Sequence, residues 1–494
     1  MVIPSKLSRW LVRLIPILVL IGTASELSAR LGGGGGYSGG GGGGYSGGGG
    51  GGYSGGGGSY SGGGGGSYPP ITAKEFLTGM LCMSPLGVFM LYSCRNTTHA
   101  PTVIGRASRE AVDWDVIAEA DPDFSPVLFR DFVYTLFSKI HEARGDKGLA
   151  RFGQFIVEDA LKDLRELNPH ATDVQGVIVG ALQIHRVDVV GDNTRVTLAF
   201  KANYTESWGG APPAAVYSHQ IWVLQRAGTA KSRPPEAITV FDCLACGSSF
   251  EPDPTGVCSH CGELVKPGMR HWSLTAVTER ERRSVGPALT HSVPDVGLNL
   301  PTRYAPDYQE DLAWFEREHP EFKFEAMTNR FKHIFYELQE AWSEQDLERL
   351  RPFETDSLFQ NHSYWVREYQ KQGLRNELGQ VRIRKLEVVK IRSDRFYDAM
   401  TCRIFASMTD CTRWANGSIA CGNPSVPKQF SEYWTFIRGR GVSENNYANS
   451  GCPSCGAELK ITMAGICGYC DSKLTSGQFD WVLSEIQQDE EYHG

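Results

Sequence analysis

Eight cysteines constrain this chain most strongly, because they form two cassettes with the same spacing. In each cassette, eleven residues separate two C-x2-C pairs, and a tryptophan (Trp272 or Trp481) follows the last cysteine by eleven positions. Two C-x2-C pairs joined by a short spacer are typical of a four-thiolate metal site. The first cassette contains Cys243, Cys246, Cys258 and Cys261, and the second contains Cys452, Cys455, Cys467 and Cys470.

Zinc fits both cassettes, because four thiolates satisfy its tetrahedral preference and leave no open position for catalysis. The sequence therefore predicts two structural zinc ribbons. A rubredoxin-like iron, or disulfides in an oxidising compartment, are the alternatives that the spacing leaves open. Gly247, Gly262 and Gly456 each follow a C-x2-C pair, where a tight turn favours positive φ.

The cassettes belong to a longer internal repeat. Behind the last cysteine, the two copies carry apolar residues at equal distances, namely Trp272, Leu274 and Val277 in one and Trp481, Leu483 and Ile486 in the other. Upstream, further segments match, including Phe129–Tyr134 with Phe331–Tyr336, Val196–Glu206 with Met400–Asp410, and Ile221–Arg226 with Tyr433–Arg438. The chain therefore reads as two copies of one unit, each a globular domain followed by a ribbon.

Composition narrows the class of protein. The 494 residues suffice for two or three domains, and the net charge of −7 argues against a chain built chiefly to bind nucleic acid. Thirteen cysteines, most of them in C-x2-C pairs, indicate a reducing compartment in which thiols remain available to metal.

The N-terminal region predicts a membrane protein. Residues 1–29 have a basic start and a short apolar run typical of a signal peptide, although an uncleaved anchor is an alternative. Residues 30–70, rich in Gly, Tyr and Ser, indicate a flexible tether. Residues 76–94 contain no charge and are long enough for a transmembrane helix, with a buried helical hairpin as the alternative. Arg95, Arg106 and Arg109 follow, as expected of a cytoplasmic flank.

This topology predicts a single-pass protein of the cell inner membrane whose C-terminal domains face the cytoplasm. The expected domains are a first globular domain at 124–240 with its ribbon at 241–280, a linker at 281–314, and a second domain at 315–441 with its ribbon at 450–488. In both domains, helical periodicity precedes the strand patterns, with helices near Phe129–Ile140, Phe331–Trp342 and Phe353–Gln370. Helices followed by antiparallel strands indicate an α+β fold.

The second copy resembles the Tim44-like domain family. The resemblance rests on Ala341-Trp342, Leu347, Leu350-Arg-Pro, Asp410, Gly417 and Glu432–Arg438. It implies two nuclear-transport-factor-2-like cone domains, each with a hydrophobic pocket, at a membrane surface. The first copy at 124–240 carries fewer of these residues. Because the motif residues are structural in kind, they specify a fold more than an activity.

Candidate catalysts are sparse. Tyr336, His333 and Asp410 are present in the second copy, but their spacing does not join them into a proton-transfer site. A basic run in a predicted strand suits either anionic lipid or RNA, or is simply a solvated strand face; it comprises Arg382, Arg384, Lys385, Lys390 and Arg392.

The sequence thus predicts a non-enzymatic binding or scaffold protein that acts in protein translocation or membrane-protein assembly. The expected partners are membrane lipid and a protein at the membrane, with no DNA. An RNA- or ribosome-binding membrane protein and a cone-fold enzyme acting on an apolar small molecule are the alternatives.

Overall fold

The structure is a computed structural model that describes residues 112–145, 148–238, 241–249, 257–284, 289, 298–442, 451–489 and 491–494. The predicted signal peptide (1–29), tether (30–70) and transmembrane helix (76–94) lie outside these residues. Within them, every helix is too short or too polar to cross a membrane. We call residues 112–284 the first half and residues 298–494 the second half.

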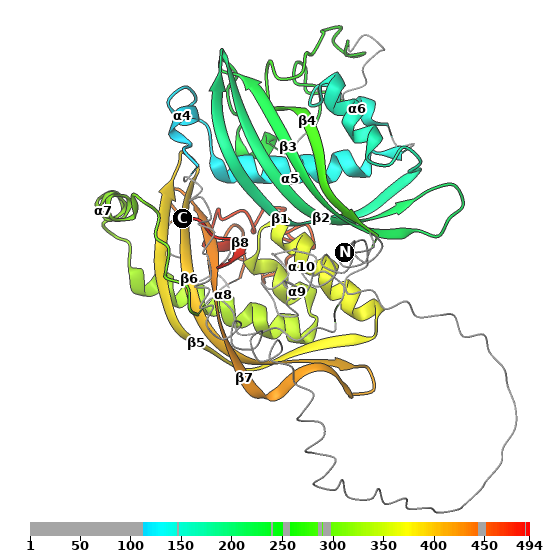
Figure 1. Ribbon diagram of the computed structural model, residues 1–494. Helices are drawn as coiled ribbons and strands as arrows, with labels where there is room; N and C mark the ends of the chain where they lie inside the picture. Colours follow the sequence, from blue (N-terminus) through cyan, green and yellow to red (C-terminus); the bar gives the residue numbers. More distant parts are fainter. Residues whose placement is uncertain are drawn as a thin grey trace, which may run out of the picture. The chain divides into compact units, whose positions relative to one another are not determined.

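In the first half, helices precede a four-stranded antiparallel sheet with the strand order β1-β2-β3-β4 (Figure 1). The elements are α4 (Asp115–Ala118), α5 (Pro126–Glu142), η3 (Leu149–Phe152), α6 (Glu158–Glu166), β1 (Asp173–Val190), β2 (Asn193–Ser207), β3 (Ala214–Ala227), η4 (Pro235–Ala237) and β4 (Ser273–Arg283).

The second half repeats this plan with the strand order β5-β6-β7-β8 (Figure 1). The elements are α7 (Tyr308–Glu318), α8 (Phe324–Glu344), α9 (Leu347–Leu350), η5 (Arg351–Phe353), α10 (Asp356–Lys371), β5 (Leu374–Ser393), β6 (Tyr397–Trp414), β7 (Ile419–Gly439) and β8 (Val482–Gln488). Mixed helices and antiparallel sheets agree with the predicted α+β class. A turn at Asn416-Gly417, a residue pair that favours hairpin turns, joins β6 to β7, with Gly417 at φ 83°.

The long helix of each half packs its apolar stripe on the sheet. In α5, Ser125 accepts a hydrogen bond from the Leu128 backbone N–H, and Pro126 occupies the first turn, so the helix begins where the sequence favours it. The predicted stripe is buried along its whole length, at Phe129, Phe132, Val133, Leu136, Phe137 and Ile140. The corresponding stripe of α8 is buried at Phe331, Ile334, Phe335, Leu338 and Trp342.

The fourth strand of each sheet comes after the cysteine cassette in sequence. Trp222 in β3 pairs with Val277 in β4, and Trp434 in β7 pairs with Ile486 in β8. The predicted ribbon ranges 241–280 and 450–488 include residues of these fourth strands. Their backbone hydrogen bonds place those residues in the sheets instead. Each cassette therefore lies between the third and fourth strands of a sheet in sequence. After the cassette, the chain returns to the sheet edge, where the fourth strand pairs with the third.

Two isolated bridges show that the halves correspond in detail. Ile156 forms a parallel bridge with Leu274, and Glu354 forms the same kind of bridge with Leu483. In both cases the residue lies just before a helix, α6 or α10, and its partner lies in the fourth strand. The fourth strand thus contacts both its sheet and the helical layer.

The tryptophans repeated behind the cassettes are core residues. Trp481 is fully buried, and the guanidinium carbon of Arg438 lies 4.7 Å from its ring centroid. In the first half, Arg226 lies 4.8 Å from the ring of Trp272. The repeated Arg and Trp therefore form one cation–π contact per half, between the third strand and the residue preceding the fourth.

The predicted linker 281–314 contains ordered structure where it is described. It includes the last residues of β4 and the first turns of α7. The Ala305 backbone N–H donates to the Val389 carbonyl at 2.9 Å, so this segment attaches to β5 of the second half.

Candidate metal centres

Each C-x2-C pair forms a turn closed by backbone hydrogen bonds. The N–H four residues after the first cysteine donates to that cysteine's carbonyl, with N···O distances of 2.8 Å at Gly247, Gly262 and Gly456 and 3.1 Å at Asp471. These four residues have φ between 58° and 75°. The prediction of positive φ at the three glycines is confirmed, and Asp471 adopts the same conformation in the fourth turn.

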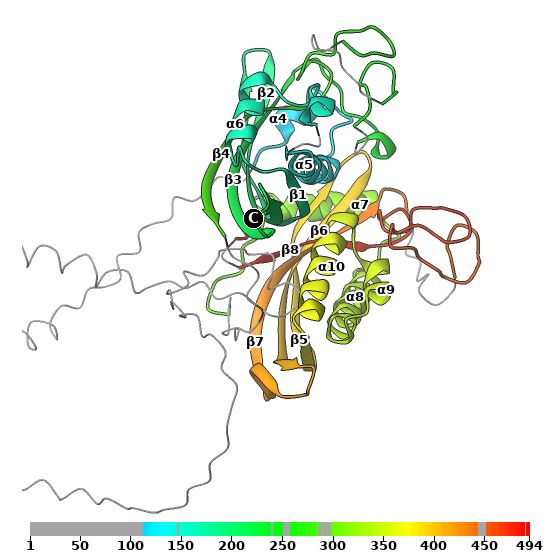
Figure 2. The same ribbon diagram turned by 90° about the vertical axis from the view of Figure 1, so that its right-hand side faces the viewer.

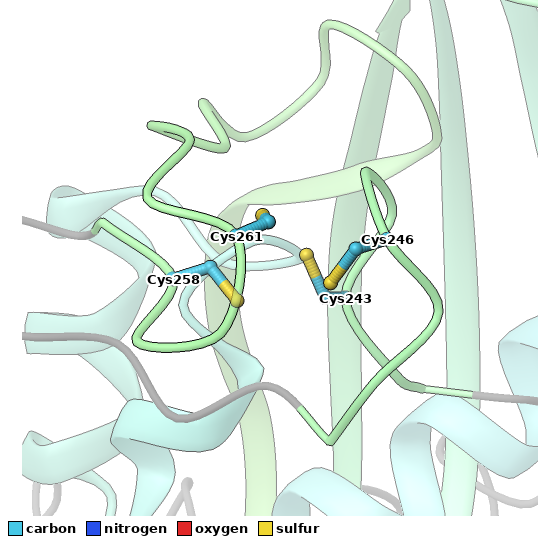
Figure 3. A group of neighbouring side chains, drawn as sticks. All are labelled: Cys243, Cys246, Cys258 and Cys261. Carbon is cyan, nitrogen blue, oxygen red and sulfur yellow. The ribbon is translucent and has the colours of Figure 1, made fainter.

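The turns bring four sulfurs together in each cassette. All sulfurs of a cassette lie within 4.8 Å of one another. In the second cassette the sulfurs of Cys452 and Cys470 are 3.8 Å apart, and those of Cys455 and Cys467 are 3.9 Å apart. A tetrahedral zinc with Zn–S bonds of about 2.3 Å requires sulfur separations of about 3.8 Å. Figure 3 shows the first cassette, whose cysteines come from two facing loops.

Local hydrogen bonds favour the thiolate form at one cysteine of each cassette. The backbone N–H of Ser248 lowers the pKa of Cys246 to about 7, and the Ser472 side chain lowers the pKa of Cys470 to about 6. The Tyr469 N–H also points to the sulfur of Cys467 at 3.5 Å. Desolvation and hydrogen bonds with the other sulfurs raise the pKa of Cys243, Cys261 and Cys455, so the fit to Zn²⁺ rests on four sulfur donors at tetrahedral spacing.

Buried polar side chains attach each cassette to its own half. In the first half, Gln154 is fully buried; its amide donates to the Asp242 carbonyl at 2.8 Å and accepts from the Leu244 N–H at 2.9 Å. In the second half, Arg351 is 1% exposed and donates to the carbonyls of Met463 and Glu354, both at 2.9 Å.

Arg351 also contacts Gly465 closely. A Cβ added at Gly465 would lie 2.2 Å from the Arg351 guanidinium, and Gly465 has φ 74°. Glycine is therefore required there both by the backbone conformation and by the arginine. The sequence singles out Leu350-Arg-Pro only through the family resemblance. Its position in the chain does not indicate that Arg351 contacts the second cassette.

The residue before each repeated tryptophan differs between the halves. In the second half, Asp480 forms a buried ion pair with Arg330 at 3.0 Å. In the first half, the equivalent His271 packs against the Phe132 ring with centroids 4.5 Å apart. Burial, together with the nearby Arg233 and Arg226, lowers the pKa of His271 to about 3. His271 is therefore neutral at physiological pH.

We expect acid to destabilise the first half through His271. Its folded pKa of about 3 lies below the unfolded value of 6.5, so its contribution is complete above pH 6.5 and is lost progressively toward pH 3. Between pH 7 and 5 this loss amounts to about 2 kcal/mol. His271→Leu should reduce the pH dependence of unfolding, measured by denaturant titration of the full chain, by that amount.

The matched control is His170→Leu at an exposed position, which should leave the pH dependence unchanged. If the unfolding free energies of the wild type and of His271→Leu changed equally with pH, His271 would not be the source of the acid destabilisation. His141 is also buried, and its pKa is also lowered by burial and by Arg144, so some pH dependence should persist in the variant.

The three candidate catalysts have separate partners. The Tyr336 hydroxyl accepts from the Ile383 N–H at 3.1 Å, and the His333 ring lies 4.0 Å from Glu337. Asp410 is buried and accepts from the Asn376 amide at 2.7 Å. Tyr336 and His333 are substantially exposed on α8, whereas Asp410 lies in β6. The structure therefore gives these side chains structural partners and does not bring them into one site.

Several members of the predicted basic run have partners in the second half. Lys385 pairs with Glu387 at 2.7 Å, and Lys390 donates to the Gly494 carbonyl at 3.0 Å. Arg392 pairs with Asp311. Arg382 and Arg384 are exposed on β5. The basic surface is thus smaller than the sequence suggested.

One part of the chain matches a known protein family. A model of the Tim44-like domain family matches residues 309–449, which include all but the first residue of α7, and α8 to α10 and β5 to β7 entirely. This segment is therefore a Tim44-like domain, in agreement with the resemblance seen at 315–441. Strand β8 and the second cassette lie beyond the matched residues. A search of curated proteins found no match to the chain.

Proposed function

We propose that this chain is a membrane-anchored, non-enzymatic scaffold that presents two Tim44-like domains at the cytoplasmic face of the inner membrane. The match at 309–449 carries the proposal, because Tim44-like domains are generally binding domains. The candidate catalysts Tyr336, His333 and Asp410 have structural partners, which favours binding over catalysis. Protein translocation or membrane-protein assembly is the role that fits best, with a protein and membrane lipid as partners.

The first half is proposed as a second domain of the same type. In both halves helices precede four strands of the same sheet order, and both have the helix-to-fourth-strand bridge, although α9 and η4 each occur in one half only among the described elements. The Arg–Trp contact is also repeated. These equivalences support a duplication of the whole unit, cassette included.

Both cassettes are proposed to hold structural zinc. Cys243, Cys246, Cys258 and Cys261 would bind one ion, and Cys452, Cys455, Cys467 and Cys470 the other. Bound zinc would fix the loop that connects the third strand to the fourth. With all four positions filled by sulfur, the ion would have a structural role.

The interior of the second half is filled by aromatic side chains. Phe436 is fully buried, and its ring stacks on the ring of Phe331 with centroids 3.8 Å apart. Trp434 and Trp481 are fully buried beside them. A charge at Phe436 would therefore disrupt the core, so partner binding is better tested with surface variants.

Membrane topology tests the proposal. A reporter that is active only in the cytoplasm, fused after Gly494, should be active, because residues 76–94 would return the chain inward. A periplasm-dependent reporter at the same position is the control and should be silent. If only the periplasmic reporter were active, the proposed location would be wrong and the cysteines would lie in an oxidising compartment.

A further inference from the structure

The turn between β6 and β7 exposes apolar side chains in a segment without charge. From Trp414 to Pro427 the chain contains no Asp, Glu, Lys or Arg. Within it, Trp414, Ile419 and Val426 are 44%, 50% and 58% exposed. In Figure 2 this turn lies at the lower end of the orange strand β7. We call Trp414–Pro427 the apolar hairpin.

The end of the apolar hairpin is apolar on both faces. The Trp414 N–H donates to the Ser418 carbonyl at 2.9 Å, and Ile419 pairs with Arg413. Because neighbouring residues of a strand point to opposite faces, Trp414 and Ile419 lie on different faces. Such an end suits insertion tip-first into an apolar layer better than packing of one face against a flat surface.

The outer edge of the hairpin cannot accept another strand. Strand β8 pairs with β7 only from Glu432 to Ile437, so the earlier part of β7 has no such neighbour within the described residues. Pro424 and Pro427 lack the N–H that strand addition needs. In addition, Asn423 accepts from the Val426 N–H at 3.0 Å, in a bulge that turns the backbone away from regular pairing. A second copy of the chain or a peptide is thus disfavoured as an added strand.

Cations surround the hairpin. Arg413 and Lys428 bracket it in sequence, and Arg375 lies opposite Arg413 in β5. Farther along β5, Arg382 and Arg384 are exposed. Glu377 pairs with Arg413 at 2.7 Å and offsets one of these charges. A tryptophan beside basic residues is the combination found where proteins meet the headgroups of anionic lipid.

We propose that the apolar hairpin inserts into the interface of a bilayer that contains anionic lipid. Trp414, Ile419 and Val426 enter the boundary between headgroups and acyl chains, and the surrounding arginines contact the lipid phosphates. This assignment rests on the proposed location at the membrane and names the surface that makes the contact.

The test uses the full chain reconstituted into vesicles, with a benzoyl-phenylalanine at position 419. The matched control carries the probe at position 189, because Val189 is 59% exposed near the turn between β1 and β2, where Asp188 and Asp192 are close in sequence. On vesicles of phosphatidylcholine mixed with phosphatidylglycerol, the probe at 419 should form a lipid adduct. The yield of lipid adduct from position 419 should be lower by about fivefold or more on vesicles of phosphatidylcholine alone. A similar decrease is expected on the mixed vesicles when the probe is at position 189.

A protein adduct between two copies, no adduct, or equal lipid labelling at both positions would overturn the assignment. The double change Trp414→Ser and Val426→Ser should lower the lipid adduct formed at 419, and an undiminished yield would also contradict it. If the chain stays in the vesicles after alkaline washing but position 419 is unlabelled, only this inference fails. If washing removes the chain, the proposed membrane location fails as well.

Discussion

Replacing one cysteine of the second cassette, Cys455→Ser, should reduce the zinc content of the full chain from two ions to one and should also loosen strand β8. A structural zinc site of this kind contributes on the order of 10–16 kcal/mol, comparable to the stability of a whole domain. Because β8 follows the cassette, and both Leu483 in β8 and Trp481 just before it are buried in the core, the damage should extend beyond the ribbon. Hydrogen exchange of the detergent-purified chain should show faster exchange in β8 than in β4.

Two controls separate the metal from general damage. Cys421→Ser changes a partly buried cysteine outside both cassettes and should leave two zinc ions bound. Cys246→Ser, in the first cassette, should have the opposite effect: β4 should lose protection from hydrogen exchange and β8 should keep it. If Cys455→Ser lost zinc while β8 kept its protection, the cassette would be an independent appendage rather than part of the sheet connection.

The second large effect is expected at Arg351, which joins the second cassette to its helical layer. Arg351→Met removes buried hydrogen bonds to the Met463 and Glu354 carbonyls and a salt bridge to Asp356. The expected loss is about 3 kcal/mol of unfolding free energy in the second half, because charged hydrogen-bond donors are lost and buried acceptors remain. Zinc content should stay at two, since no cysteine is changed.

Arg349→Met is the matched control, two residues away. Arg349 pairs with Glu337, Glu340 and Glu344, but its side chain is 29% exposed. Solvent screens such pairs, so this change should cost about 1 kcal/mol or less. Denaturant unfolding of both variants gives the comparison, and equal losses would show that Arg351 does not anchor the cassette.

The sequence predicted the parts of the fold that have a strong local pattern. The stripes of α5 and α8 follow helical spacing, and Gly417 marks the hairpin turn. By contrast, α6 has only 9 residues, so its few apolar side chains form too short a pattern to predict a helix. The grouping of four sulfurs in each cassette was predictable because the spacing of the cysteines is itself the geometric requirement.

Contacts between distant segments were not predictable from one sequence. The pairing of Trp434 with Ile486 spans the whole second cassette, so β8 was assigned to the ribbon that precedes it. Arg351 and Gly465 meet only after folding, and neither has a local signal of the contact. The repeated Trp272 and Trp481 were noticed, but their role in the sheet core depended on this long-range pairing.

We propose that two four-sulfur zinc centres connect the third and fourth strands of two equivalent sheets. Elemental analysis of the full chain, combined with X-ray absorption at the zinc edge, tests it most directly. We expect two zinc ions per chain, each bound by four sulfurs at about 2.3 Å. Iron in place of zinc, less than one zinc per chain, or oxygen and nitrogen ligands at the metal would contradict it.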